Sequence, residues 1–401
     1  ASPVEPPVPD FSRATCELID SYDTRRLDEI LTTELYDFLS TALAPVGFPK
    51  ARYAVNLHRI TYPSFIPEDC NRPTVASGLI AVPVGIKPER GENTIPTMPV
   101  VSYQHGTIFS NHEVPSNPED SGETRLMIAQ FAGQGYAVIG ADYFGKGESA
   151  ATETDAYLVK ASTQQACLDM LRASLKVSSE LGFRMGDLFL SGWSQGSWNT
   201  LVFLNKLESM DIKVSAAAIA SAPTDLYALM NRWIHAPADI DAEYLPGLLA
   251  VQLNAYEKYY GMAGTAASAI KPEFQQVASE LYLNKITWEN FYDKTPARLQ
   301  QFLKTEFMDA GSIGNSPIWK QIQENQSYRW RSKTPLHTYY GDKDEVIPEY
   351  IAKLPVAYQT LMGGGETSAF PAGPEANHRG TFAYAIAHQK RWFDGLRSNN
   401  F

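Results

Sequence analysis

The stretch that decides the fold is Gly192-Trp193-Ser194-Gln195-Gly196, in which a serine lies midway between two glycines. The apolar run 188–193 predicts a buried strand that leads into it, and residues 199–207 have the spacing of a helix. A serine in a sharp strand-to-helix turn is exposed for attack, and the two glycines avoid collisions with neighbouring backbone. The pattern therefore predicts that Ser194 is a catalytic nucleophile.

An alternation of strands and helices surrounds this turn. Apolar and β-branched patterns predict strands at 53–62, 76–84, 99–103, 136–141, 188–193 and 214–220, and helices at 123–133, 158–181 and 199–207. Parallel neighbours in a sheet need a crossover connection, which is usually a helix. The sequence therefore predicts an α/β fold with a mostly parallel central sheet and helices on both faces.

The alternation stops near Thr224 and resumes only with an expected strand at 336–340. The residues between are mostly helical in pattern and rich in Tyr, Trp and Met, so we interpret 224–332 as an inserted helical cap. A cap would lie over the carboxyl ends of the parallel strands, where ligands bind. Candidate substrate-binding residues are aromatic: Trp193, Tyr143, Trp233 and Tyr256. Aromatic residues of a cap can equally well fill its own core.

A serine hydroxyl needs an imidazole that accepts its proton, and the imidazole needs a carboxylate that orients it. With a G-x-S-x-G turn, the chain order of the three residues is serine, acid, histidine. His378 lies in an expected loop before the C-terminal helix 382–396, whereas His388 lies inside that helix. We therefore predict His378 as the general base.

The acid is expected in the loop that follows strand 336–340. This loop offers three carboxylates, Asp342, Asp344 and Glu345. Asp344 is preferred, because an apolar pair and a proline follow it closely and place it at the inward point of the turn. Asp342 and Glu345 remain alternatives, and an ordinary role for Asp342 is to cap the loop backbone.

The negative oxygen of the transition state needs backbone N–H donors, and glycine lets the backbone approach it closely. The stretch Gln104-His105-Gly106-Thr107 follows an expected strand and suits this purpose. The expected donors are the N–H of Gln195 and that of either Thr107 or Gly106, with Thr107 slightly preferred. His105 precedes Ser194 in the chain and is therefore assigned to this loop.

No sequence pattern requires a cofactor or a metal. Asp142-Tyr143-Phe144-Gly145-Lys146-Gly147 lacks the frame of a phosphate-binding loop, and neither H-E-x-x-H nor C-x-x-C occurs. A net charge of −11 leaves no basic field for nucleic acid, and no apolar run reaches the length of a membrane-spanning helix. The expected partner is an ester substrate, either a small molecule or attached to a polymer. The sequence does not indicate an oligomeric state.

The N-terminal stretch begins Ala1-Ser2-Pro3 and is rich in proline, like a chain after removal of a secretory signal peptide. We therefore expect a secreted or periplasmic protein. Cysteines of such proteins commonly form disulfides, and Cys16 and Cys70 both lie in the N-terminal part of the chain. We expect a disulfide between these two, and the alternative is three reduced thiols.

At these residues the chain resembles the secretory lipase group of the α/β-hydrolase superfamily, which includes lipase-like esterases secreted by plant-pathogenic bacteria. The resemblance rests on stretch 104–107, on Asp142-Tyr143, on Gln195 after Ser194, and on Asp344 and His378. It implies an α/β-hydrolase fold and hydrolysis of acyl esters through an acyl-enzyme. The expected organisation is an N-terminal, partly helical extension at 1–50, a core at 51–223 and 333–401, and the cap at 224–332.

The chain departs from that family's pattern at Ser197, where a further glycine is common, and at Phe144 and Lys146. Acidic residues such as Asp239 and Glu243 in the cap favour an esterase for short-chain or aromatic acyl esters over a lipase with an apolar lid. A peptidase, amidase or acyltransferase on the same fold is an alternative. A non-catalytic binding module is a second alternative, although such a module would be expected to have lost a catalytic residue.

Overall fold

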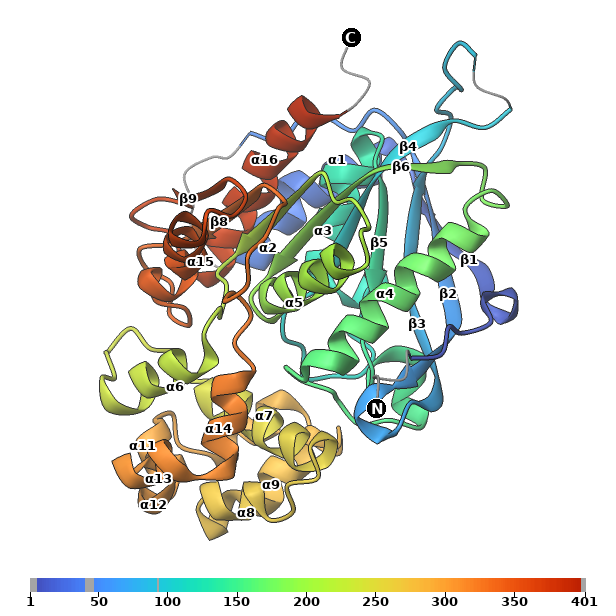
Figure 1. The fold of residues 1–401 in the computed structure, drawn as a ribbon. Coiled ribbons are helices and arrows are strands. Elements are labelled where there is room, and N and C mark those ends of the chain that lie inside the picture. Colours follow the sequence, from blue (N-terminus) through green and yellow to red (C-terminus); the bar gives the residue numbers. More distant parts are fainter. Residues whose placement is uncertain (1–5, 40–46, 92–93, 398–401) are drawn as a thin grey trace.

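The computed structural model describes residues 6–39, 47–91 and 94–397, which fold around one nine-stranded sheet (Figure 1). The strand order is β1-β2-β3-β5-β4-β6-β7-β8-β9, antiparallel from β1 to β5 and parallel from β5 to β9. The strands are β1 (Thr15–Tyr22), β2 (Val55–Ile66), β3 (Arg72–Pro83), β4 (Thr97–Gln104), β5 (Ala137–Ala141), β6 (Arg184–Trp193), β7 (Ala216–Ala220), β8 (Leu336–Tyr340) and β9 (Thr367–Pro371).

Helices cover both faces of the sheet, and each face has its own hydrophobic core. One face carries α4 (Lys160–Val177), α5 (Gln195–Ser209) and α15 (Glu349–Met362). The other carries α1 (Thr24–Glu29), the π-helical turn Ile30–Glu34, α2 (Leu35–Leu39), α3 (Gly122–Phe131) and α16 (His378–Leu396). The predicted fold class, a mostly parallel sheet between two layers of helices, is confirmed.

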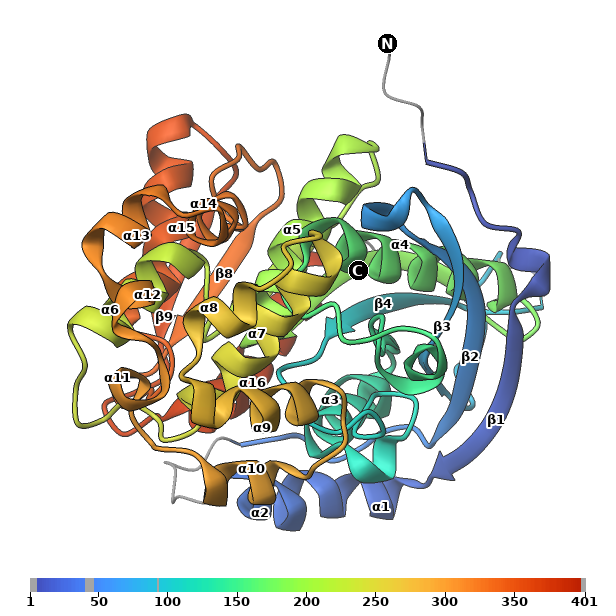
Figure 2. The same cartoon turned by 90° about the horizontal axis from the view of Figure 1, so that it is seen from below.

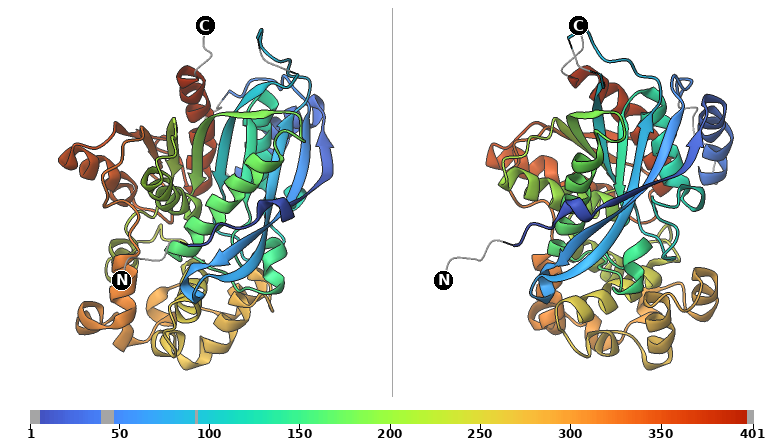
Figure 3. Two further views of the ribbon diagram at one scale, coloured as in Figure 1. Left: turned by 45° about the vertical axis from the view of Figure 1, so that its right-hand side comes forward. Right: turned by 90° about the vertical axis from the view of Figure 1, so that its right-hand side faces the viewer.

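Nine helices follow β7 in the described part of the chain and precede β8. They are α6 (Leu226–His235), α7 (Leu245–Tyr259), α8 (Thr265–Ala269), α9 (Pro272–Tyr282), α10 (Trp288–Lys294), α11 (Leu299–Phe302), α12 (Thr305–Met308), α13 (Ala310–Asn315) and α14 (Pro317–Glu324). They gather at one end of the sheet, as the side views show (Figure 3). Seen from that end, they lie in front of part of the sheet, while β1, β2 and β3 stay visible beside them (Figure 2). Their buried side chains continue the core beneath α4 and α5.

Strand β1 is the main element that the sequence did not predict. Its burial shows no clean alternation along Thr15–Tyr22, because it is the edge strand and most of its side chains are exposed or half-buried. The expected N-terminal extension therefore supplies a strand of the sheet as well as helices. The prediction of strand 336–340 agrees with β8 at both ends.

The expected disulfide between Cys16 and Cys70 is wrong, since all three cysteines are free. Cys16 pairs with Ile60 in the middle of β2, whereas Cys70 follows the end of that strand at Ile66. Six strand residues separate these points by about 20 Å, and a disulfide needs Cα atoms within about 7 Å. Burial instead raises the pKa of the Cys16 thiol to about 11.

None of the helices in 6–39, 47–91 and 94–397 combines the length and the apolarity needed to cross a bilayer. Residues 1–5, on which part of the expected secretory start depends, lie outside the described residues.

Candidate active site

Ser194 occupies the turn between the end of β6 and the start of α5, with φ 56° and ψ −122°. Its N–H donates to the carbonyl of Ala220 in the neighbouring strand β7, over 2.9 Å. A Cβ atom at Gly192 would overlap the carbonyl of Gly196, and one at Gly196 would overlap the carbonyl of Gln104. Both glycines are therefore required by the close approach of backbone on the two sides of the serine.

Three side chains that are far apart in the sequence meet at this turn. The Oγ atom of Ser194 lies 2.9 Å from Nε2 of His378. The other ring nitrogen, Nδ1, lies 3.0 and 3.2 Å from the two carboxylate oxygens of Asp344. The Oδ1 atom of Asp344 also accepts the backbone N–H groups of Val346 and Ile347, over 2.9 and 3.0 Å. These bonds fix the orientation of the carboxylate towards the imidazole.

The two alternative acids do not contact the ring. Asp342 is exposed to solvent, and Glu345 accepts the backbone N–H of His378 over 3.0 Å. His378 is the first residue of α16 rather than a loop residue as expected, because Asn377 caps the helix by accepting the N–H of Gly380 over 2.8 Å. The base is therefore anchored at the start of a helix whose inner face is buried.

Burial and charge act in opposite directions on both titratable groups. Burial alone disfavours the charged ring, but the neighbouring Asp344 carboxylate outweighs it and raises the pKa of His378 above its ordinary value. Burial alone would raise the pKa of Asp344, but the ring of His378 and the N–H of Ile347 hold that pKa below its ordinary value. The carboxylate is thus ionised beside a ring whose affinity for a proton is increased.

The structure distinguishes between the candidate N–H donors to the oxyanion. Gln195 is the first residue of α5, and the first N–H groups of a helix have no partner within it. The N–H of Gly106 donates to Oε1 of Glu123 over 2.7 Å, and the hydroxyl of Tyr103 donates to the same oxygen over 2.7 Å. The amide of Gly106 is therefore occupied, and Thr107 is the remaining candidate of the two.

His105 is buried below this loop and stacks on the ring of Tyr143, with ring centroids 3.9 Å apart. The hydroxyl of Tyr143 donates to the carbonyl of His105 over 2.8 Å. The structure gives both residues a packing role beneath the oxyanion loop, and neither lines the two cavities beside Ser194.

Two cavities of very different size adjoin Ser194. The larger has a volume of about 1030 Å³, opens to solvent between cap and core, and includes Trp193 in its lining. The smaller has a volume of about 30 Å³, is somewhat less open to solvent, and includes Trp233 in its lining. Tyr256 lines neither, because it is fully buried and its hydroxyl donates to the carbonyl of Leu158 over 2.9 Å.

Sequence reasoning missed several residues that shape this site. Glu123 sits in the first turn of α3 and no motif marks it, although a buried carboxylate at that place is unusual. Phe109 and Trp288 stack face to face in the wall of the larger cavity, with centroids 4.4 Å apart. Trp288 carried a signal, since it belongs to the aromatic-rich cap sequence.

Comparison with known families and structures agrees with this architecture. The model of the secretory lipase family matches residues 120–372. A search of curated proteins gives no significant match.

Solved structures share the fold at low sequence identity. A Legionella pneumophila protein regarded as a hydrolase superposes with a TM-score of 0.82 at 20% identity, over 96% of this chain and 98% of its own. A mutant of LipA, a rice cell wall degrading esterase from Xanthomonas oryzae, gives 0.79 at 18% identity, over 96% and 98%. Candida antarctica lipase A in its closed state gives 0.64 at 16% identity, over 96% and 83%.

The family match covers more than half of the chain, and the fold and the arrangement around Ser194 agree with it. The chain therefore belongs to the secretory lipase family and is a carboxylic-ester hydrolase with an α/β-hydrolase fold.

Proposed function

We propose that the enzyme hydrolyses esters through an acyl-enzyme on Ser194, with His378 as general base and then acid, and with Asp344 orienting it. The observation that carries this proposal is the continuous chain of short contacts from Oγ through the imidazole to the carboxylate, 2.9 and 3.0 Å long. The N–H groups of Gln195 and Thr107 are assigned to the developing oxyanion.

In the first half-reaction, Oγ of Ser194 bonds to the ester carbonyl carbon while its proton passes to Nε2 of His378. The bond from that carbon to the alcohol oxygen then breaks, and Nε2 gives the proton to the departing alcohol. In the second half-reaction, a water loses its proton to Nε2 and attacks the acyl-enzyme. The acid leaves as Oγ takes the proton back, so the enzyme returns to its starting state.

The cavity sizes favour a short acyl group and a larger alcohol. A cavity of about 30 Å³ holds about two or three water-sized groups at roughly 10–15 Å³ each. Its lining is mostly apolar and includes Leu229, Met230 and Trp233. The acyl chain is assigned to this cavity, and the alcohol to the open one. An aromatic acyl group, which the sequence left as an option, would need the smaller cavity to widen.

The family and one structural relative suggest where the enzyme acts. Secretory lipases are named for export from the cell, and the LipA esterase is named for degrading rice cell walls. We propose an extracytoplasmic enzyme that can act on esters attached to a polymer. The cavity of about 1030 Å³, to which the alcohol is assigned, is the larger of the two and opens to solvent.

The test is hydrolysis of p-nitrophenyl esters from acetate to palmitate by the wild type, Ser194→Ala and a control, Ser191→Ala. Ser191 is a buried serine three residues away whose hydroxyl makes no hydrogen bond. We expect Ser191→Ala to resemble the wild type, Ser194→Ala to lose activity, and acetate to be preferred. Full activity in Ser194→Ala would refute the assignment of Ser194 as the nucleophile. A preference for palmitate would refute the proposed specificity for short acyl chains. If the wild type cleaves none of the esters, peptidase, amidase or acyltransferase activity takes precedence.

A further inference from the structure

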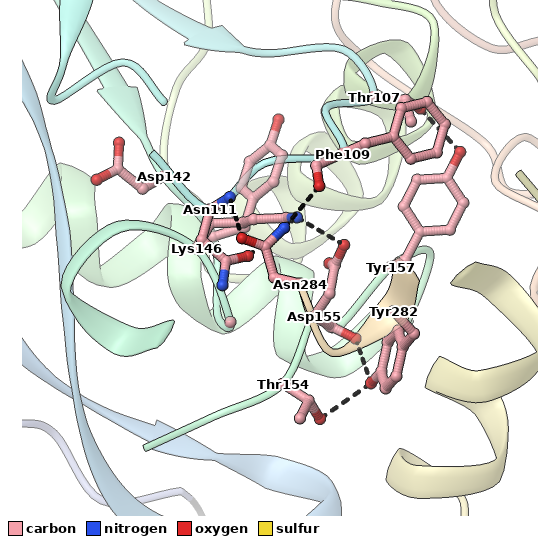
Figure 4. Close-up of polar contacts among 12 residues, drawn as sticks. Thr107, Phe109, Asn111, Asp142, Lys146, Thr154, Asp155, Tyr157, Tyr282 and Asn284 are labelled. Atoms are coloured by element: carbon pink, nitrogen blue, oxygen red, sulfur yellow. Dashed lines mark hydrogen bonds and ion pairs between the residues drawn. The ribbon is translucent and has the colours of Figure 1, made fainter. Parts of the chain in front are cut away.

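The segment 107–111, which continues the oxyanion loop, is held by the cap (Figure 4). Asn284 lies between α9 and α10 of the cap, and its Nδ2 donates to the carbonyl of Phe109 over 2.7 Å. Its Oδ1 accepts the N–H of Asn111 over 3.4 Å. One amide side chain therefore contacts a carbonyl and an N–H group of the same segment, two and four residues beyond Thr107.

The core holds the same segment from its other side. The ammonium group of Lys146 donates to Oδ1 of Asn111 over 3.4 Å and lies 3.4 Å from a carboxylate oxygen of Asp155. Both charged side chains are only 6% exposed, so this ion pair is shielded from water. The N–H of Gly147 donates to the carbonyl of Asn111 over 2.9 Å. The far end of segment 107–111 is thus fixed to a buried, paired charge.

A third set of contacts joins the cap to the residues beside this ion pair. The hydroxyl of Tyr282, at the end of α9, donates to the carbonyl of Asp155 over 2.8 Å and contacts Thr154 over 3.0 Å. Two residues further along, the hydroxyl of Tyr157 lies 2.8 Å from Oγ1 of Thr107. These contacts therefore connect the cap to Thr107 through residues 154–157 of the core.

We propose that Asn284 is a positioning residue for the oxyanion loop, so that the cap contributes to the rate of the chemical step as well as to substrate binding. The inference rests on the proposed function, in which the N–H of Thr107 stabilises the oxyanion. Such a donor works only if it is oriented before the charge develops. The two hydrogen bonds of Asn284 fix the peptide groups that follow Thr107. Without them, the N–H group of Thr107 is no longer held in the orientation that stabilises the oxyanion.

The backbone conformation of Asn284 allows its side chain to be removed without strain. Its φ is 60°, in the left-handed region that glycine adopts freely. Asn284→Gly therefore removes the amide side chain without straining the turn. Asn71→Gly is a matched control, because Asn71 also has a positive φ, 56°, and lies in the β2–β3 connection, outside both the cap and segment 107–111.

The experiment measures kcat and KM for p-nitrophenyl acetate, and the affinity for a trifluoromethyl ketone, whose serine adduct carries an oxyanion. We expect Asn284→Gly to lower kcat roughly 10- to 100-fold, as for a displaced catalytic group, with KM nearly unchanged and a parallel loss of ketone affinity. Tyr282→Phe, which keeps the ring and loses the two contacts of its hydroxyl, should lower kcat less. Asn71→Gly should leave all three quantities unchanged.

A rise in KM with unchanged kcat would overturn the proposal, because it would show that Asn284 only touches the substrate in the open cleft, which it also lines. Unchanged kinetics in both Asn284→Gly and Tyr282→Phe would overturn it as well. If Asn284→Gly fails to fold, Tyr282→Phe decides alone. Ser194→Ala separates the two claims: if this variant is inactive while the Asn284 and Tyr282 variants equal the wild type, the proposed function stands and the positioning role falls.

Discussion

At the scale of single residues, the pH dependence of the reaction depends on His378. The ring must be neutral to accept the proton of Ser194, and the Asp344 carboxylate, against the opposing effect of burial, raises the pKa of the ring above its ordinary value of 6.5. Activity is therefore full above this raised pKa and is lost as the pH falls through it. We expect kcat/KM for p-nitrophenyl acetate to show an acid limb with a midpoint above pH 6.5.

Asp344→Asn tests the cause of that midpoint. The amide removes the negative charge that favours the protonated ring, so the acid limb should move to lower pH. It also presents the wrong partner to Nδ1, and activity should fall by up to about 10⁴-fold, the loss known for such a substitution in a serine protease. A profile of kcat/KM against pH measures both effects. An unchanged midpoint would contradict the assignment of Asp344 as the orienting acid.

At the scale of elements, the close packing of β6, α5 and the end of β4 depends on Gly196. A Cβ there overlaps the carbonyls of Gln104 and His105, which cannot move without shifting β4. Gly196→Ala should therefore lower both the free energy of unfolding, by about 1–3 kcal/mol for overpacking, and kcat. Urea unfolding and ester hydrolysis measure the two losses.

The control for this variant is Gly314→Ala. Gly314 lies in helix α13 with open space where the new Cβ would stand. Alanine favours a helix over glycine by up to about 1 kcal/mol. Gly314→Ala should thus leave the free energy of unfolding unchanged or raise it, with unchanged activity. If Gly196→Ala keeps the stability and activity of the wild type, the turn at Ser194 can accommodate the added methyl group and the prediction is wrong.

Helix α6 of the cap supplies one wall of the smaller cavity through Met230. Met230→Ala removes three heavy atoms from that wall, so the acyl pocket should lengthen. The ratio of kcat/KM for hexanoate to that for acetate should rise roughly tenfold, as expected for added methylene contacts. Met308→Ala, in a helix of the cap whose residues do not line this cavity, should leave the ratio unchanged. An unchanged ratio in Met230→Ala would show that the acyl chain does not bind in the smaller cavity and would assign it to the larger one.

At the scale of the whole molecule, cap and core share one hydrophobic cluster. Buried residues of the cap, such as Leu249 and Phe302, belong to the same cluster as Leu190 in β6 and Trp198 in α5. Because the cap shares its hydrophobic core with the sheet, the cap should not stay folded once the sheet has unfolded. We expect a single unfolding transition in urea, with tryptophan fluorescence and far-UV circular dichroism coinciding. Two separate transitions would show that the cap unfolds independently of the sheet.

Different parts of this molecule could be predicted from the sequence to different degrees. Strands β7 and β8 were predicted because buried apolar and aromatic residues dominate them, although β8 also contains His337 and Thr338. Strand β1 was missed because an edge strand with exposed side chains has no period to detect. The disulfide was wrongly expected because the distance between Cys16 and Cys70 depends on the register of β1 against β2, which the sequence does not reveal.

By itself, the sequence determined the fold class and the turn at Ser194, because both follow from local patterns: apolar spacing along elements, and glycines where backbones approach closely. The order of serine, acid and histidine also followed from the pattern. Only the tertiary structure decided which carboxylate of loop 342–345 faces His378, that Glu123 occupies the amide of Gly106, and that Asn284 reaches the oxyanion loop. These contacts join residues up to 175 positions apart, and such distances depend on how whole elements pack.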